Sequence, residues 1–99
     1  MKRYILTKPA AQDIDEIKTY LVAEAGVHIA RRIIRELRTS MEFLGGSPEA
    51  GHFREDLTDK PVKFWPVFSY LIVYDPERRP IEVLRVLHGA RDLEIELNR

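Results

Sequence analysis

The sequence of 99 residues contains no cysteine, which excludes disulfide bonds, thiolate nucleophiles and cysteine-ligated metal sites and fits a reducing compartment. It carries no net charge, because 16 Lys and Arg balance 16 Asp and Glu, so no general attraction to nucleic acid or to an anionic membrane is expected. The basic start Met1–Arg3 precedes an apolar stretch too short for a signal peptide. No stretch approaches the ~20 apolar residues of a membrane span. These absences predict a cytoplasmic protein with one domain over residues 1–99.

Recognisable patterns for catalysis and cofactor binding are also missing. The three histidines, His28, His52 and His88, are not spaced as metal ligands. No serine lies in a nucleophile elbow, and the pair Gly45-Gly46 is too short for a phosphate-binding loop. We therefore expect neither a metal nor a cofactor.

The first half of the chain predicts a short strand over residues 3–6 and then two amphipathic helices. Thr7 is placed to cap the first helix, and Gly26 to end it in a left-handed conformation. The second helix should stop at Gly45-Gly46. Apolar residues recur at helical spacing in both segments: Ala10, Ile14, Ile17 and Leu21, then Ala30, Ile33, Ile34, Leu37, Met41 and Leu44. The short connection between them predicts an antiparallel helical hairpin.

The second half is rich in strand-forming residues. After a polar loop that reaches Pro61, strands are predicted at Val62–Trp65, Tyr70–Tyr74 and Ile81–His88, the first of them ended by Pro66. The order of elements predicts an α+β fold. It comprises an N-terminal strand, an antiparallel helical hairpin and a three-stranded antiparallel continuation of the sheet. The last ten residues would add a short C-terminal helical tail.

Two sets of side chains are candidates for binding. One is a row of arginines on a single face of the second helix: Arg31, Arg35 and Arg38. They could bind an acidic partner or nucleic acid, but a solvated face is favoured, since Arg32 and Glu36, like Arg38 and Glu42, are spaced as ion pairs. The other is Trp65, which could anchor an interface or stack on a base, although a lone tryptophan on a half-buried strand is more often part of the core.

The last predicted strand carries the remaining candidates. Alternation assigns its residues to two faces: Val83, Arg85 and Leu87 on one, and Leu84, Val86 and His88 on the other. A cation among apolar neighbours must reach a carboxylate or a cleft, so Arg85 belongs either to a fold-holding ion pair or to a functional site. His88 could be a general acid or base. A structural role is favoured, in which it bonds a backbone carbonyl or Asp92 and organises the turn, because no second catalytic group is fixed by spacing.

Four segments form a pattern along nearly the whole chain: Tyr4-x-Leu6-Thr7-x-x-Ala10-x-x-Asp13-Ile14-x-x-Ile17, Ser47-Pro48-x-x-Gly51, Tyr70-x-Ile72-x-Tyr74 and Arg85-Val86-Leu87-His88-Gly89-Ala90-Arg91-Asp92. In this order they resemble the RelE/ParE toxin superfamily, and the last segment is the most specific. The resemblance implies the α+β fold deduced above. It also implies a toxin of a type II toxin–antitoxin module that a cognate antitoxin neutralises.

The superfamily includes RelE-like toxins, which cut mRNA on the ribosome with basic residues of the sheet, and ParE-like toxins, which poison DNA gyrase. Lys63 matches a basic position of RelE-like members, but Trp65 and Leu71 stand where further cations are expected. Their loss weakens both oxyanion stabilisation and docking on RNA. The resemblance therefore implies the ParE-like branch, with DNA gyrase as target and no direct binding to nucleic acid.

The ParE-like interpretation assigns no catalytic residue and predicts a partner-binding set: Trp65, Arg85, His88, Arg91, Asp92, Leu93 and Leu97. The alternative, a ribosome-dependent mRNA endonuclease, would use another set assembled across the sheet: Arg54, Lys63, Arg85, His88 and Arg91. A third interpretation is an inactive homologue that only binds its antitoxin.

Overall fold

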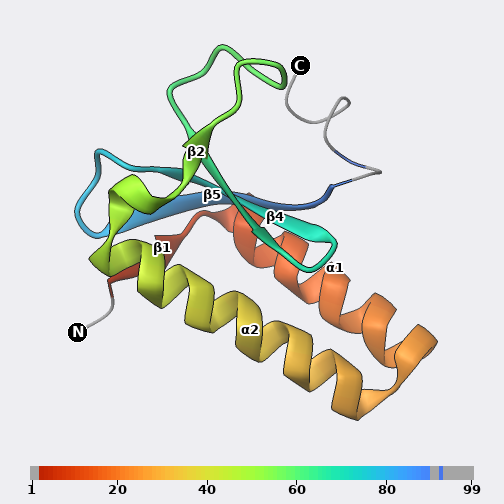
Figure 1. Cartoon of the computed structure of the whole chain (residues 1–99). Helices are drawn as coiled ribbons and strands as arrows, with labels where there is room; N and C mark the ends of the chain where they lie inside the picture. Colours follow the sequence, from red (N-terminus) through yellow and green to blue (C-terminus); the bar gives the residue numbers. More distant parts are fainter. Residues whose placement is uncertain (1–2, 90–91, 93–99) are drawn as a thin grey trace.

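A computed structural model describes residues 3–89 and 92 of the chain. Its elements are, in order, β1 (Tyr4–Leu6), α1 (Lys8–Ala25), α2 (Val27–Gly46), the 3₁₀ turn η1 (Pro48–Ala50), β2 (His52–Phe53), β3 (Lys63–Val67), β4 (Tyr70–Asp75) and β5 (Ile81–His88). The helices form a hairpin that lies against one face of the sheet (Figure 1). The predicted α+β fold is therefore confirmed, whereas the predicted C-terminal helical tail lies outside the described residues.

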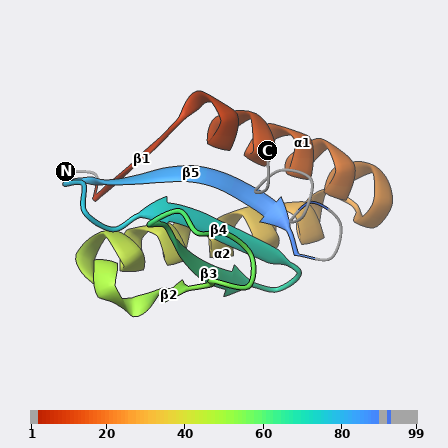
Figure 2. The ribbon, with the colours of Figure 1, turned by 90° about the horizontal axis from the view of Figure 1, so that it is seen from above.

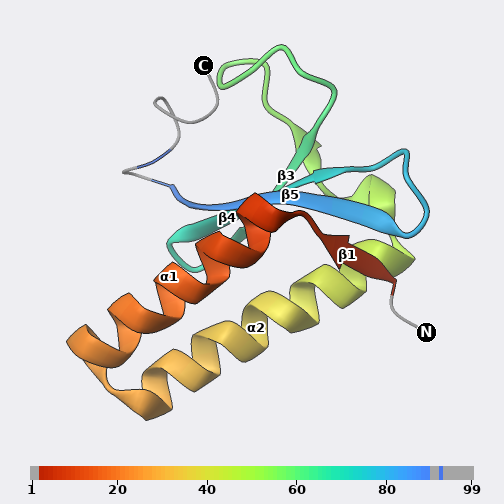
Figure 3. The same cartoon turned by 180° about the vertical axis from the view of Figure 1, so that it is seen from behind.

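The sheet has the strand order β1-β5-β4-β3-β2, and β5, β4 and β3 lie side by side in Figure 2. These three strands run antiparallel to one another, but β1 pairs with β5 in parallel, next to the start of the helical hairpin (Figure 3). The predicted antiparallel continuation of the sheet is confirmed, and the long excursion through both helices allows the parallel pairing of β1, which the sequence did not specify. The short strand β2 was also missed within the predicted polar loop.

Pro66 lies inside β3, although the sequence predicted that it would end this strand. The neighbouring strand β2 pairs only with Lys63 and Phe64, so the outer side of β3 is a free edge at Pro66. Proline is tolerated on an edge strand because its missing amide removes no necessary ladder hydrogen bond.

The observed ends of the two helices lie at the predicted residues Thr7, Gly26 and Gly45-Gly46. The Thr7 hydroxyl accepts a hydrogen bond from the Ala10 amide at 3.2 Å and donates one to the Leu84 carbonyl at 2.9 Å, which ties the start of α1 to β5. Gly26 separates the helices with a φ of +91°, a positive value as predicted, although its ψ of 167° is extended. The helix α2 ends at Gly46, within the predicted Gly45-Gly46 pair, and a side chain at Gly45 would collide with the backbone of Arg3.

The main core lies between the helical hairpin and the sheet. It contains nearly all of the predicted helical stripe, with Leu37 and Leu44 fully buried and Ile14 and Ile33 partly buried at its margin. A second, smaller core lies apart from it and was not expected from the sequence: Val62, Phe64, Val73 and Leu87, with Leu57, Leu71 and Leu84 packed against them. The sheet therefore has apolar side chains on both faces.

A bulge changes which face each residue of β5 occupies. Tyr74 pairs with Val83 and Val73 with Arg85, so Leu84 has no partner of its own across the sheet. The predicted strict alternation is wrong here, because Val83 and Val86 both pack in the main core, whereas Leu84 and Leu87 pack in the second. An extra residue in one strand shifts the alternation of all residues after it.

The hydroxyl of Tyr74 holds the turn that follows α2. It donates a hydrogen bond to the Pro48 carbonyl at 2.7 Å and accepts one from the Gly51 amide at 2.9 Å. Burial raises the pKa of Tyr74. A Cβ atom at Gly51 would collide with this hydroxyl, so a residue without a side chain is required there.

Candidate protein-binding surfaces

Arg85 is held by a buried carboxylate of α1. Its Nε donates to Asp13 Oδ2 at 2.7 Å and its Nη2 to Oδ1 at 2.9 Å, and the Val86 amide also donates to Oδ2 at 2.9 Å. Because β1 pairs with β5 only as far as Val83, Asp13 satisfies a backbone donor just beyond the end of this pairing. The structure thus places Arg85 in the fold-holding ion pair, one of the two alternatives left open by the sequence.

His88 lies at the end of β5, where the chain turns. Its backbone amide donates to Asp92 Oδ2 at 2.9 Å, and the Asp92 amide donates to the His88 carbonyl at 3.0 Å. The imidazole packs edge-on against Tyr70, with 5.6 Å between ring centroids. Its Nδ1 is buried without a hydrogen-bond partner among the described residues. The carboxylate of Asp92, bonded to the backbone, therefore organises this turn, while the imidazole packs on an aromatic ring.

The basic residues of the nuclease alternative have separate surroundings. Arg54 makes a bidentate contact with Asp56 at 2.7 and 2.9 Å, and this hydrogen bond raises the pKa of Arg54. Lys63 donates to the Glu49 carbonyl at 3.1 Å and lies 4.8 Å from the centre of the Phe53 ring. Each of these two cations thus has a contact of its own within the chain.

Their positions in the sheet keep them apart from His88. Lys63 pairs with Tyr74, whereas His88 pairs with Tyr70. The two partners are four residues apart on β4, or roughly 13 Å at the usual rise of a strand. Among the described members of the proposed set, no constellation of cations and an acid or base surrounds one point. Arg91 lies outside the described residues.

Trp65 is half-buried and packs against the main core. Its ring lies 5.4 Å from that of Phe43 on α2, at an angle of 44°. Most of the Trp65 side chain therefore packs in the core, as expected for a lone tryptophan. The rest of its ring lies beside Phe43. Two further residues of the predicted partner-binding set, Leu93 and Leu97, lie outside the described residues.

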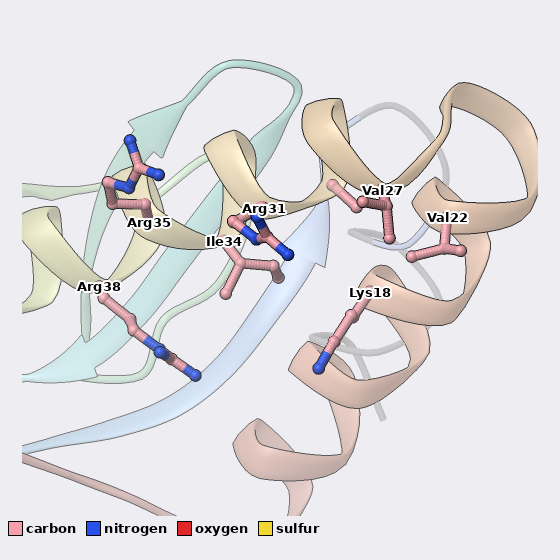
Figure 4. Close-up of a pocket in the computed structure, with 8 residues that line it drawn as sticks. Lys18, Val22, Val27, Arg31, Ile34, Arg35 and Arg38 are labelled. Carbon is pink, nitrogen blue, oxygen red and sulfur yellow. The ribbon is translucent and has the colours of Figure 1, made fainter.

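The most prominent hollow on the molecule lies between the two helices. It has a volume of about 510 Å³, and we call it the hairpin groove; its lining residues are Lys18, Val22, Val27, Ala30, Arg31, Ile34, Arg35 and Arg38. Figure 4 shows Lys18 of α1 and Arg38 of α2 directed toward the space between the helices, with Ile34 between them. The hairpin groove thus combines an apolar floor with a basic rim.

The arginines of the hairpin groove form no ion pair within residues 3–89 and 92. The ion pairs in the described part of the protein involve other basic residues, namely Arg54, Arg78 and Arg85. The expected pairs of Arg32 with Glu36 and of Arg38 with Glu42 are not formed among the described residues, while the solvated face itself stays a prediction. The groove contains four cations and no carboxylate among its lining residues, so it is locally positive on a protein of zero net charge.

The sequence indicated this surface only in part. The row of Arg31, Arg35 and Arg38 was visible as a helical face, but the contribution of α1 was not recognised. Lys18 and Val22 are spaced four residues apart and lie on one side of α1, which was the available signal. Their position opposite the arginines depends on how the two helices pack.

Neither α1 nor α2 combines the length and the apolar character needed to cross a membrane. Within residues 3–89 and 92, no three histidine or acidic side chains come together as a group that could hold a metal ion.

Comparison with known proteins identifies the family. Residues 4–93 match the model of a family described as the ParE toxin of the type II toxin–antitoxin system parDE. The chain belongs to the ParE toxin family. It is 31% identical to toxin ParE1 of Caulobacter vibrioides over 97 residues, covering 98% of this chain and 99% of that toxin. Toxin ParE3 of the same organism is 24% identical over 99 residues, covering 100% of this chain and 98% of that toxin.

A solved structure agrees with this membership at the level of the fold. A chain from the chromosomal ParDE toxin–antitoxin system of P. aeruginosa superimposes with a TM-score of 0.73 at 20% identity. The match covers 89% of the present chain and 96% of the other. The ParE branch indicated by the missing RelE-like cations is thus confirmed, and the chain is a toxin of the type II toxin–antitoxin class.

Proposed function

We propose that this ParE-family toxin acts in the cytoplasm by binding DNA gyrase, and that a cognate antitoxin neutralises it by occupying the hairpin groove. The observation that carries the proposal is the groove itself, in which four cations surround an apolar floor without a carboxylate from the chain. A toxin that must be held inactive by a partner needs such a surface, where apolar contact and charge recognition are combined.

The groove favours an acidic amphipathic segment as the bound part of the antitoxin. Its α2 side extends from Val27 to Arg38, about 17 Å at the rise of a helix, which matches three turns of a bound helix. Apolar side chains of such a helix would cover Val22, Val27 and Ile34. Flanking Asp or Glu residues would meet the arginines, for which the described part of the toxin supplies no ion pair.

Inhibition by protein contact, without RNA cleavage, is supported by the dispersed basic residues. Arg54, Lys63 and Arg85 each contact their own partner, and Lys63 and His88 lie at separate places on the sheet. Phosphodiester cleavage requires preorganised donors around the developing charge, and losing one donor commonly costs ~10²–10³ in rate. The expected activity is therefore loss of supercoiling in the presence of purified gyrase.

The test of the target compares two reactions with the same toxin preparation. We expect inhibition of supercoiling by purified DNA gyrase and no cleavage of mRNA on translating ribosomes. Cleavage at defined codon positions together with unaffected supercoiling would contradict the proposed target and establish the endonuclease.

The test of the antitoxin site reverses two charges at the groove. The double variant Arg31→Glu/Arg38→Glu should weaken binding of the antitoxin encoded in the same operon by about 10-fold or more, because like charges then face each other. Arg32→Glu is the matched control, since Arg32 is exposed on the same helix but does not line the groove. Calorimetric titration measures the affinity of the antitoxin for the double variant and for the control. Equal affinities for the double variant and the control would contradict this site.

A further inference from the structure

Phe68 has an unusual position at the tip of the hairpin between β3 and β4. It is 61% exposed, the highest value among the exposed large apolar side chains of the described residues. Val67 pairs with Tyr70, so Phe68 is the first residue of a two-residue turn. Its φ is +54°, in the left-handed region, where only a few per cent of non-glycine residues are found.

Folding alone does not explain a phenylalanine at this position. Two-residue hairpin turns favour Gly, Asn or Asp where φ is positive, because a bulky side chain is strained there. A ring that remains in solvent also adds little to the core. A glycine at position 68 would suit the turn better, and the described residues leave most of the aromatic ring exposed.

The turn presents this ring from a rigid base. The Gly89 amide donates to the Ser69 carbonyl at 2.8 Å, which joins the hairpin tip to the residue after β5. Val67 and Tyr70 on either side are buried in the main core. Figure 1 shows the hairpin and the end of β5 at the same end of the sheet. A backbone that is already fixed before binding loses little entropy on association, and aromatic side chains are typical interface anchors.

The surroundings favour a protein partner over a membrane. The chain has no lysine or arginine between residues 64 and 75, so the hairpin lacks the cations that accompany insertion into anionic lipid. It also differs in character from the hairpin groove, whose rim is basic. A single ring with uncharged neighbours fits a closed apolar pocket on the surface of a folded protein.

We infer that Phe68 is the anchor with which this toxin inserts into an apolar pocket of its protein target. The inference rests on the proposed action through a protein target, but it does not depend on that target being gyrase. It also assigns the target-binding surface to a different part of the molecule from the antitoxin-binding hairpin groove. The predicted partner residue His88 lies close by, since it pairs with Tyr70 at the base of the same hairpin.

The decisive variant is Phe68→Gly, which removes the ring and suits the positive φ. It should raise the midpoint of thermal unfolding by roughly 2–5 °C, because the backbone strain is relieved. At the same time it should weaken gyrase binding by about 30-fold or more and abolish growth arrest, as expected for an anchor residue. Phe68→Tyr keeps the ring and should restore most of the activity.

The matched control is Phe53→Ala, which removes an equally exposed phenylalanine, 56% accessible, from β2. It should leave growth arrest and gyrase binding within about two-fold of the wild type, as for a side chain outside the interface. Equal losses in Phe53→Ala and Phe68→Gly would overturn the assignment, because any exposed ring would then have the same effect. A lowered unfolding midpoint in Phe68→Gly would overturn the argument from strain.

Growth arrest and gyrase inhibition together separate this inference from the proposed target. Growth arrest by the wild type without gyrase inhibition, lost in Phe68→Gly, would reject gyrase and retain the anchor. Full growth arrest by Phe68→Gly would reject the anchor whatever the target, and a wild type that causes no arrest would reject both. If the wild type, but not Phe68→Gly, sediments with phosphatidylglycerol vesicles, Phe68 inserts into a membrane and the inferred pocket on a protein is rejected.

Discussion

At the scale of single residues, Asp13 connects a helix to the unpaired part of a strand. The carboxylate accepts hydrogen bonds from the Arg85 guanidinium and from the Val86 amide. The apolar surroundings of Arg85 predicted that this cation needs a carboxylate. Asp13 could not be singled out, because many acidic residues of the chain were possible partners and only packing brings residues 13 and 85 together.

The first prediction at this scale concerns Asp13→Asn. The change removes the negative charge to which both the Arg85 guanidinium and the Val86 amide are bonded, so we expect a loss of about 2–4 kcal/mol in the free energy of unfolding. Urea denaturation measures this loss. Asp15→Asn, on the exposed side of α1, is the control and should stay within about 0.5 kcal/mol of the wild type. Equal stability of the two variants would mean that the ion pair contributes nothing to the fold.

At the scale of elements, the helix α2 contributes side chains both to the core and to the hairpin groove. One side carries the fully buried Leu37 and Leu44, while the other carries the arginines of the hairpin groove. The first property follows from a spacing of three and four residues and was predicted. The second requires α1 as the opposite wall, and a groove between two helices is not encoded by the periodicity of either one.

The prediction for α2 concerns the replacement of a buried apolar side chain by alanine. Leu37→Ala should cost about 2–5 kcal/mol, because it leaves a cavity between the hairpin and the sheet. Ile29→Ala on the same helix is the control, since Ile29 is 44% exposed, and it should change stability by less than about 0.5 kcal/mol. Chemical denaturation of both variants measures the difference. A loss below half a kcal/mol at Leu37 would show that the buried face of α2 is assigned wrongly.

At the scale of the whole molecule, the predicted binding residues are distributed over several regions. Trp65 packs beside α2, Arg85 is bound to α1, and His88 lies at the end of β5 beside the hairpin of Phe68. Such a distribution is ordinary for a surface that binds a protein, where a few anchors carry most of the energy. The mRNA-endonuclease alternative would instead need its groups within hydrogen-bond reach of one point.

The prediction at this scale compares His88→Ala with deletion of residues 90–99. Loss of a general acid or base typically costs 10²–10⁴ in rate, so His88→Ala would nearly abolish a nuclease. For a protein-binding toxin we expect folded His88→Ala to retain part of the growth arrest and the deletion to lose more.

Two cellular measurements accompany this comparison. Growth arrest should bring DNA-damage signalling without cut transcripts, as measured by a reporter of the damage response and by mapping of mRNA ends. Codon-specific mRNA cleavage that His88→Ala removes would overturn the proposed mode of action. Circular dichroism of both variants confirms that the comparison is made between folded proteins.

The sequence by itself determined the elements whose signals are local. Helical periodicity defined the two helices, the capping hydroxyl of Thr7 marked where the first begins, and runs of β-branched and aromatic residues defined β4 and β5. These features depend on neighbours within a few residues, so they can be predicted from the sequence alone. The family pattern could be read for the same reason, since its motifs are short and occur in order.

Tertiary structure alone decided the features that join distant segments. The parallel pairing of β1, the bulge opposite Val73 and Tyr74, and the Asp13–Arg85 ion pair all bring together residues far apart in the chain. The hairpin groove is of the same kind, because Lys18 and the arginines of α2 meet only when the helices pack. The strain at Phe68 likewise appears only in the folded backbone, since residue type does not reveal a positive φ. Loop closure and packing, which depend on the whole chain, determine these contacts.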